Sequence, residues 1–145
     1  MRKDTGKEIY QLAEKLFPIC RSITGEGVRQ TLAILAEFIE QANAEMIIYE
    51  VASGTKAFDW TVPKEWVIRS AYIEDSNGNH VIDFKNNNLH VLGYAAPVDR
   101  WVELEELFQY IYTQPDQPNV IPYVTSYYKE RYGFCMSEAQ KRSLK

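Results

Sequence analysis

The chain has 145 residues, of which 46% are hydrophobic and 25% charged, and its formal net charge is −4. Roughly two thirds of the unfolded surface of such a chain can be removed from water, so a buried core is expected. The acidic excess argues against a nucleic-acid partner, because phosphate binding needs a clustered basic face. No apolar run approaches the about 18 residues of a membrane span, and no apolar core follows the charged start. Neither a membrane helix nor a signal peptide is therefore predicted.

Cysteine usage indicates a reducing compartment. Cys20 and Cys135 are the only two cysteines and lie far apart in the sequence. Two isolated cysteines form neither a disulfide scaffold nor a zinc knuckle. Both have apolar neighbours, which favours buried, inert thiols. We therefore expect a cytoplasmic protein and no catalytic cysteine.

Two amphipathic helices are predicted in the first third of the chain. Thr5 followed by Glu8 fits a capping box, and Pro18 should end the helix that begins there. Thr24 is the expected N-cap of a second helix, whose apolar stripe runs to Ala42. These stripes must be covered by something, which leaves an interaction or oligomerisation role open.

Strand patterns follow the helices. Residues 46–51 predict a strand that ends at a Ser53-Gly54 turn. Residues 66–74 and 80–84 are strand-like runs on either side of Asn77-Gly78, which is a strong hairpin signal. The whole pattern predicts an α+β fold, with two N-terminal helices followed by a small β-rich domain.

The last third of the chain mixes several short elements. Asn86-Asn87-Asn88 predicts a turn, and Ser137 with Gln140 predicts a capping box that opens a C-terminal helix. Because that helix has barely begun at residue 145, we expect the natural polypeptide to continue. Other runs predict a strand, a short helix and an extended segment, at residues 89–94, 104–111 and 115–122.

Metal chemistry is the first candidate activity to weigh. A catalytic zinc site needs three protein ligands around an open position, and the chain has only two histidines, without a metal-binding spacing. His80 beside the hairpin turn is expected to be a solvated strand residue. His90 is expected to be a hydrogen-bonded structural residue, with a pocket residue as the alternative. No metal ligand is predicted here.

Binding groups are more numerous than catalytic ones. Arg21, Ser22 and Thr24 precede a helix N-terminus, where backbone N–H groups attract anions, although an ordinary capped turn has the same features. Asp59 and Trp60 belong to an aromatic segment around a proline, either a stacking surface or a packed corner. A run dense in phenolic hydroxyls suggests a ligand-facing surface, and its candidates are Tyr123, Tyr127, Tyr128 and Arg131.

Several strings, taken in order, resemble the opening of a bacterial aminopeptidase-like family of uncertain biochemical function. They include LFPICRSITG and FDWTVPKEW, at residues 16–25 and 58–66, together with residues 53–56, 87–91, 93–94, 115–118 and 121–135. The family is similar to zinc aminopeptidases built on a mixed α/β sheet, in which a small β-rich domain interrupts the catalytic domain. Some of its members are linked to polysaccharide biosynthesis.

The resemblance implies a division of the chain into three parts. Residues 1–50 would be the helical start of the catalytic domain, 51–112 the inserted β-rich domain, and 113–145 an aromatic-rich return segment. The presumed metal ligands of the family lie further along, and no position here matches them. Zinc is expected in the full-length parent, where metal-activated water would attack an amide.

The implied function is therefore the non-metal-binding portion of a zinc-dependent aminopeptidase-like hydrolase, inactive alone. Its expected partners are the rest of the catalytic domain, a peptide or saccharide substrate, and a second copy in a homo-oligomer. The alternatives are a stand-alone saccharide- or peptide-binding module and a protein-interaction domain.

Overall fold

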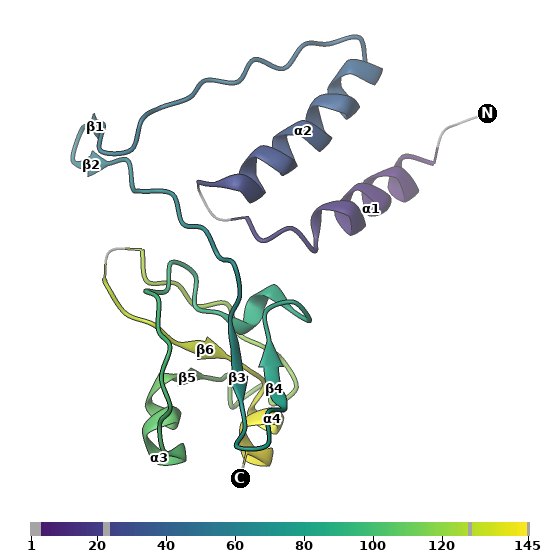
Figure 1. Cartoon of the computed structure of the whole chain (residues 1–145). Coiled ribbons are helices and arrows are strands. Elements are labelled where there is room, and N and C mark those ends of the chain that lie inside the picture. The colour runs from purple at the N-terminus through teal and green to yellow at the C-terminus, as the bar shows by residue number, and fades with distance from the viewer. Residues whose placement is uncertain (1–3, 22–23, 128, 145) are drawn as a thin grey trace. The chain divides into compact units, whose positions relative to one another are not determined.

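The computed structural model describes residues 4–21, 24–127 and 129–144, and the chain divides into two compact units. The N-terminal unit is Met1–Val67 and the C-terminal unit is Ile68–Lys145. Helices and two-stranded sheets follow one another along the chain, which confirms the predicted α+β class (Figure 1). No helix among the described residues is both long and apolar enough to cross a membrane.

The first helix, α1 (Thr5–Leu16), begins one residue earlier than the sequence suggested. Its N-cap is Asp4, whose carboxylate accepts a hydrogen bond of 3.3 Å from the backbone N–H of Lys7. The prediction of Thr5 as the cap is therefore wrong, because the carboxylate before it already satisfies that N–H. The helix ends at Leu16, ahead of Pro18 as predicted.

The second helix, α2 (Glu26–Gln41), is capped by glycine and not by Thr24. Gly25 is the N-cap with φ +103°, a conformation that L side chains rarely adopt, and as a glycine it makes no side-chain cap bond. An added Cβ on Gly25 would also lie 3.1 Å from the Trp66 backbone oxygen. The prediction of Thr24 as the cap is wrong because the chain makes its sharp change of direction one residue later.

The rest of the N-terminal unit contains one short sheet. Strands β1 (Lys56–Ala57) and β2 (Trp60–Thr61) pair antiparallel, and the predicted turn at Ser53-Gly54 is confirmed, with Gly54 at φ +88°. Residues 46–51 are extended but form no strand, so that prediction is wrong. The reason is that no described residue pairs with their backbone.

The C-terminal unit opens with the predicted hairpin. Strands β3 (Tyr72–Glu74) and β4 (His80–Asp83) pair antiparallel, and Gly78 takes φ +82° in the turn between them. The Asp75 carboxylate accepts hydrogen bonds of 2.8 and 2.9 Å from the N–H groups of Asn77 and Asn79. The first strand is shorter than the predicted 66–74, since the ladder begins only at Tyr72.

A tight turn replaces the strand predicted at residues 89–94. The Asn87 side-chain oxygen accepts a bond of 3.0 Å from the Leu89 N–H, which starts the 3-10 helix η1 (Asn88–His90). Single bridges beyond that helix join Val91 to Phe134 and Gly93 to Thr125. The predicted strand is therefore wrong as a continuous ladder, although its second half still pairs at two positions.

Short elements complete the C-terminal unit. Helix α3 (Leu104–Leu107) continues into the 3-10 helix η2 (Phe108–Tyr110). Strand β5 (Ile111–Tyr112) then pairs parallel with β6 (Phe134–Cys135), so the predicted helix ends one residue before its expected last residue. The capping box of helix α4 (Glu138–Ser143) is confirmed, with Ser137 as the N-cap.

The described buried hydrophobic side chains all belong to the C-terminal unit. Ile82, Ile111 and Met136 form the core cluster, and Leu92 and Cys135 are fully buried. Neither α1 nor α2 has a buried residue. The apolar stripe of α2 is half-buried at most of its positions, whereas that of α1 leaves Ile9 64% exposed.

Candidate functional site

One polar cluster of the C-terminal unit joins an arginine to two tyrosines that stack on each other. The Arg100 guanidinium bonds to the Glu106 carboxylate and to the phenolic oxygens of Tyr110 and Tyr132. The two rings stack with centroids 4.4 Å apart, and the guanidinium carbon lies 5.6 and 5.7 Å from their centroids. We call these four residues the Arg100 cluster. It fixes a planar cation on an exposed surface.

The electrostatics of this cluster favour the charged arginine. The bond to Tyr132, followed by the bond to Glu106, raises the pKa of Arg100 above its ordinary value. Burial raises the pKa of the Tyr132 phenol, and its hydrogen bond with Tyr110 adds to that effect. The pair therefore stays a cation beside a neutral phenol. Sequence reasoning missed this cluster because no local pattern links residue 100 to residue 132.

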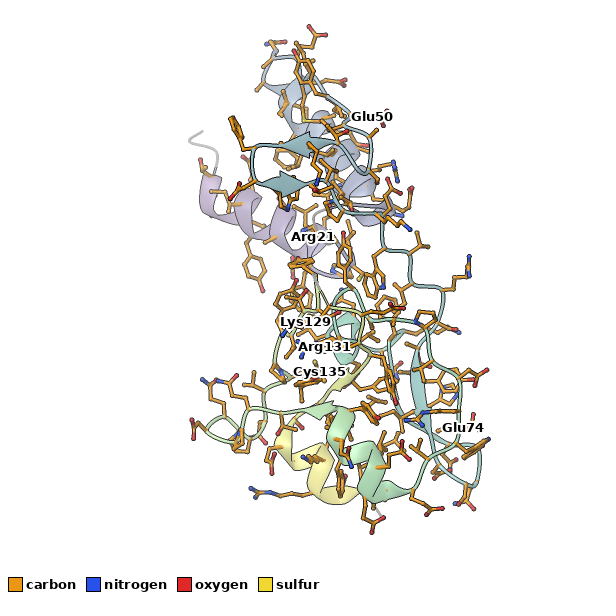
Figure 2. All side chains as sticks on the ribbon, turned by 90° about the vertical axis from the view of Figure 1, so that its left-hand side faces the viewer. Arg21, Glu50, Glu74, Lys129, Arg131 and Cys135 are labelled. Atoms are coloured by element: carbon orange, nitrogen blue, oxygen red, sulfur yellow. The ribbon has the colours of Figure 1, made fainter. Side chains whose placement is uncertain are left out.

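A second arginine organises the aromatic return segment. Arg131 donates a bond of 3.0 Å to the Thr125 backbone oxygen and one of 3.4 Å to the Tyr112 hydroxyl. Its guanidinium carbon lies 5.7 Å from the Tyr112 ring centroid. Figure 2 shows Arg131 between Lys129 and Cys135 on the segment that leads into α4. The predicted binding residue Arg131 is exposed, with some of its donors already bonded within the chain.

Three tyrosines meet beside that segment. Tyr94 and Tyr127 contact edge to face with centroids 4.9 Å apart, and the hydroxyls of Tyr123 and Tyr127 lie 3.3 Å apart. Tyr94 has φ +61°, which is rare for a bulky side chain. The buried Ser126 hydroxyl donates a bond of 2.8 Å to the Tyr94 backbone oxygen and helps to hold that conformation. We call these tyrosines the Tyr94 cluster.

The Tyr94 cluster presents an aromatic edge to solvent. The Tyr123 side chain is 65% exposed, whereas Tyr94 and Tyr127 are half-buried. The structure thus brings together the predicted candidates Tyr123 and Tyr127, close to the carbonyl that Arg131 holds. Tyr128, the other predicted phenol, lies outside the described residues.

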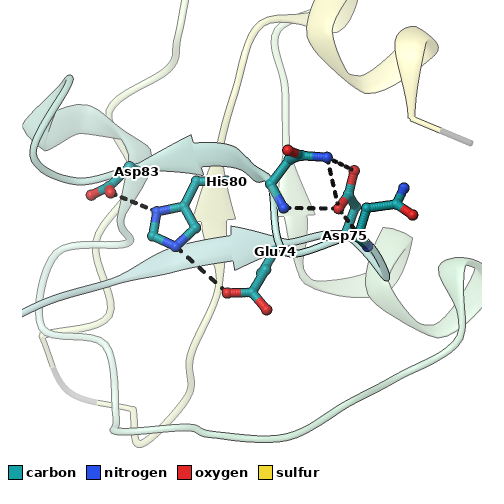
Figure 3. A network of polar contacts seen from close by, with 6 residues as sticks. Glu74, Asp75, His80 and Asp83 are labelled. Atoms are coloured by element: carbon teal, nitrogen blue, oxygen red, sulfur yellow. Dashed lines mark hydrogen bonds and ion pairs between the residues drawn. The ribbon is translucent and has the colours of Figure 1, made fainter.

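His80 is part of a polar network at the hairpin (Figure 3). Its Nδ1 lies 2.8 Å from an Asp83 oxygen, its Nε2 lies 3.6 Å from a Glu74 oxygen, and its ring stacks on Tyr72 at 4.0 Å. The Lys85 backbone N–H and then His80 lower the pKa of Asp83. Both ring nitrogens face carboxylates, so this imidazole stabilises the hairpin and offers no free ligand.

His90 is buried and bonds within the fold. Its Nδ1 lies 2.8 Å from the Cys135 backbone oxygen, which agrees with the expected structural, hydrogen-bonded histidine. Desolvation by burial raises the pKa of the Cys135 thiol to about 11, and burial also raises that of Cys20. Both thiols are therefore poor nucleophiles at neutral pH.

The predicted candidates of the N-terminal unit do not form one site. Arg21 bonds to the Leu16 carbonyl and so closes the end of α1, while half-buried Thr24 precedes the Gly25 cap. Exposed Asp59 lies in the turn between β1 and β2, next to Trp60, which is 38% exposed. Ser22 lies outside the described residues. The proposed anion site thus has its arginine engaged with a backbone carbonyl.

The potential metal donors of the described residues are dispersed. Among the described residues, no group of three or more His, Cys, Asp or Glu side chains is placed to hold a metal ion. His80 lies between Glu74 and Asp83, and both of its ring nitrogens already face carboxylates. The described residues therefore do not fit a catalytic zinc ion.

Comparison with known proteins gives consistent matches. Residues 65–145 match a family described as a domain of unknown function, DUF2172. A Clostridium acetobutylicum protein, provisionally named a polysaccharide biosynthesis protein with an aminopeptidase-like domain, is 55% identical over 135 residues. A crystal structure from Clostridium acetobutylicum, provisionally described as a peptidase, matches 98% of this chain at 52% identity with a TM-score of 0.90.

Each match covers nearly all of this chain but only a minor part of the relative. The curated relative is matched by 93% of this chain but over only 30% of its own length. For the crystal structure the matched share of its chain is 32%. The chain therefore spans less than a third of the length of the relatives it matches. The family match at residues 65–145 nearly coincides with the C-terminal unit, Ile68–Lys145.

Proposed function

The chain belongs to the DUF2172 family, and from that premise we propose that it is the non-metal-binding portion of an aminopeptidase-like hydrolase. The zinc ion of that hydrolase would be held by residues outside 1–145 and would supply the activated water. In this proposal the chain contributes surface that binds and orients a peptide or saccharide substrate. The protein would act in the cytoplasm, as its two free cysteines favour.

One observation carries this proposal. The chain matches a protein with an aminopeptidase-like domain along nearly its whole length, yet over only 30% of that protein. The described residues also offer no set of metal donors, so a metal-dependent step would need donors from elsewhere. Together these facts favour an accessory role inside a larger enzyme.

The chain's own contribution is binding and orientation. Arg131 and the exposed edge of the Tyr94 cluster place cationic and phenolic donors on neighbouring parts of one segment. Such groups can donate hydrogen bonds to a carboxylate or to sugar hydroxyls, and the aromatic rings can stack on a planar or pyranose face. Bonds from Ser126 and Arg131 to backbone carbonyls hold this surface in place before a ligand arrives.

The test compares the intact Clostridium acetobutylicum relative with two derivatives. One lacks the segment matched by this chain, and the other carries this chain in its place. Metal content and release of amino acids from aminoacyl anilides are measured for each, and for this chain alone. We expect metal and hydrolysis in the intact protein and the chimera, retained metal with reduced hydrolysis in the deletion, and neither in this chain. An intact relative without metal or hydrolysis would refute the proposal.

A stand-alone binding module is the second candidate. It is favoured by exposed aromatic side chains, Trp101 at 75% and Tyr123 at 65%. Titration of tryptophan fluorescence with oligosaccharides and short peptides tests it on this chain alone. A saturating response would support the module, and no response to either set would exclude it.

A further inference from the structure

Residues 46–51 have the sequence of a strand but pair with no strand among the residues that the structure describes. Five of the six residues are apolar, and most are β-branched or aromatic, types that favour strands. The structure keeps them extended between α2 and β1 (Figure 1). From residue 45 to 51, however, no backbone group bonds to another described residue. A row of open N–H and C=O groups is therefore available.

The side chains of residues 47–51 are exposed on both faces, and that of Met46 is half-buried. Ile47, Tyr49 and Val51 share one face and are 65%, 82% and 60% exposed. Ile48, on the opposite face, is 54% exposed and shares that face with Glu50, the one charged residue (Figure 2). A strand that is half-buried alternates apolar and polar residues. Apolar residues on both faces are typical of a strand covered on both sides.

We propose that residues 46–51 are an added strand, which pairs through its backbone with a sheet edge in the part of the longer polypeptide outside residues 1–145. The relatives supply a length argument for this occupant, since 70% or nearly 70% of each lies beyond the match. A second copy of the segment fits less well. It would pair with one backbone edge and leave the apolar side chains on both faces in water.

The proposal rests on the proposed function only in placing the chain within a longer protein. Its first test is hydrogen exchange followed by mass spectrometry, which needs no catalytic activity. Amides 46–51 are compared between this chain alone and the chimera in which it replaces the matched segment of the Clostridium acetobutylicum relative. The relative itself serves as a second long form, read at the aligned positions.

We expect fast exchange in this chain. In both long forms the alternate amides that face the partner strand should exchange at least about 100-fold more slowly, because a buried ladder amide exchanges only when the sheet opens. Fast exchange of these amides in both long forms would overturn the proposal. Slow exchange in this chain alone, with a doubled mass by sedimentation, would also overturn it in favour of a second copy. A protected strand in a long form without hydrolase activity would refute the proposed function and leave this inference standing.

Variants of the chimera give a second, independent readout. The double variant Ile48→Pro/Tyr49→Pro removes two consecutive N–H groups, one of which must face the partner strand, and should lower the melting temperature of the chimera. Glu45→Pro, just before the strand, is the matched control and should change it much less. Neither should alter the melting temperature of this chain alone, where these amides are unpaired. Equal melting of the two chimeric variants would contradict the proposed pairing.

Discussion

His90 and Ser126 are buried polar side chains, 6% and 5% exposed, and each bonds to a backbone carbonyl of a different segment. A polar group removed from water without a partner costs free energy, so these bonds decide how the segments around residues 90, 126 and 135 meet. The bond from Ser126 to the Tyr94 carbonyl helps to hold the Tyr94 cluster. At the residue scale, the candidate binding surface is thus positioned by a few satisfied polar groups beside a small core.

At Gly133 the backbone lies so close to Tyr110 and Tyr112 that a side chain has no room. An added Cβ would lie 2.6 Å from Tyr112 Cε2 and 3.0 Å from the Tyr110 backbone oxygen. We expect Gly133→Ala to lower the free energy of unfolding by about 1–3 kcal/mol, because this backbone must shift. Gly93→Ala is the control, since its nearest contacts are 3.5 Å. Urea unfolding followed by fluorescence measures both, and equal losses would contradict this reading.

The Cys135 thiol should show a pH dependence set by burial, which raises its pKa to about 11. In a Cys20→Ala background, alkylation by iodoacetamide should be slow and still accelerating above pH 9 in the folded chain. In urea the rate should level off near the ordinary thiol pKa of about 8.5. Rapid alkylation of the folded chain at pH 8 would show that the thiol is accessible and ionised.

The raised pKa of the Cys135 thiol also makes the folding stability depend on pH. The folded state keeps the thiol proton up to about pH 11, whereas the unfolded chain loses it near about 8.5. The stabilisation linked to this group is therefore fully present below about pH 8.5 and is lost as the pH rises through 11. Cys135→Ala should weaken the decline in unfolding free energy over this interval.

Elements specified by neighbouring residues were predictable, and elements that need a distant partner were not. Asn77-Gly78 predicted the hairpin, and Ser137 with Gln140 predicted the start of α4. The parallel pairing of β5 with β6 left no local signal, because it joins residues 111–112 to 134–135. The same holds for the bond between Arg100 and Tyr132 in the Arg100 cluster. The strand predicted at residues 46–51 reflects genuine local propensity without a described partner.

The capping box of α4 offers a prediction at this scale. Ser137 is buried, and its hydroxyl accepts a bond of 3.1 Å from the Gln140 N–H, while the Gln140 side chain accepts one of 2.9 Å from the Ser137 N–H. Ser137→Ala should lower the unfolding free energy by about 1 kcal/mol. Ser143→Ala, near the other end of the helix, is the exposed control and should cost less. Urea unfolding compares the two, and a reversed order would argue against the cap.

At the scale of the whole chain, burial is distributed unevenly between the two units. Every buried hydrophobic residue that the structure describes lies between Ile82 and Met136, in the C-terminal unit. The N-terminal unit instead exposes apolar side chains from its helices, including Ile9, Tyr10 and Phe17 at 64%, 66% and 77%. The family match begins at residue 65, close to where the C-terminal unit begins. A chain with this distribution should have local stabilities that differ between its units.

Fragments separate the two units directly. We expect residues 68–145 expressed alone to unfold cooperatively, because they contain the described core and its satisfied polar groups. Residues 1–67 alone should show helical signal without a cooperative transition, since neither of their helices has a buried residue. In the intact chain, limited proteolysis should cleave first within residues 44–52. Circular dichroism during heating and mass analysis of the first cleavage products provide the measurements. A cooperative transition for 1–67, or a non-cooperative one for 68–145, would show that the stabilising contacts lie elsewhere than in this core.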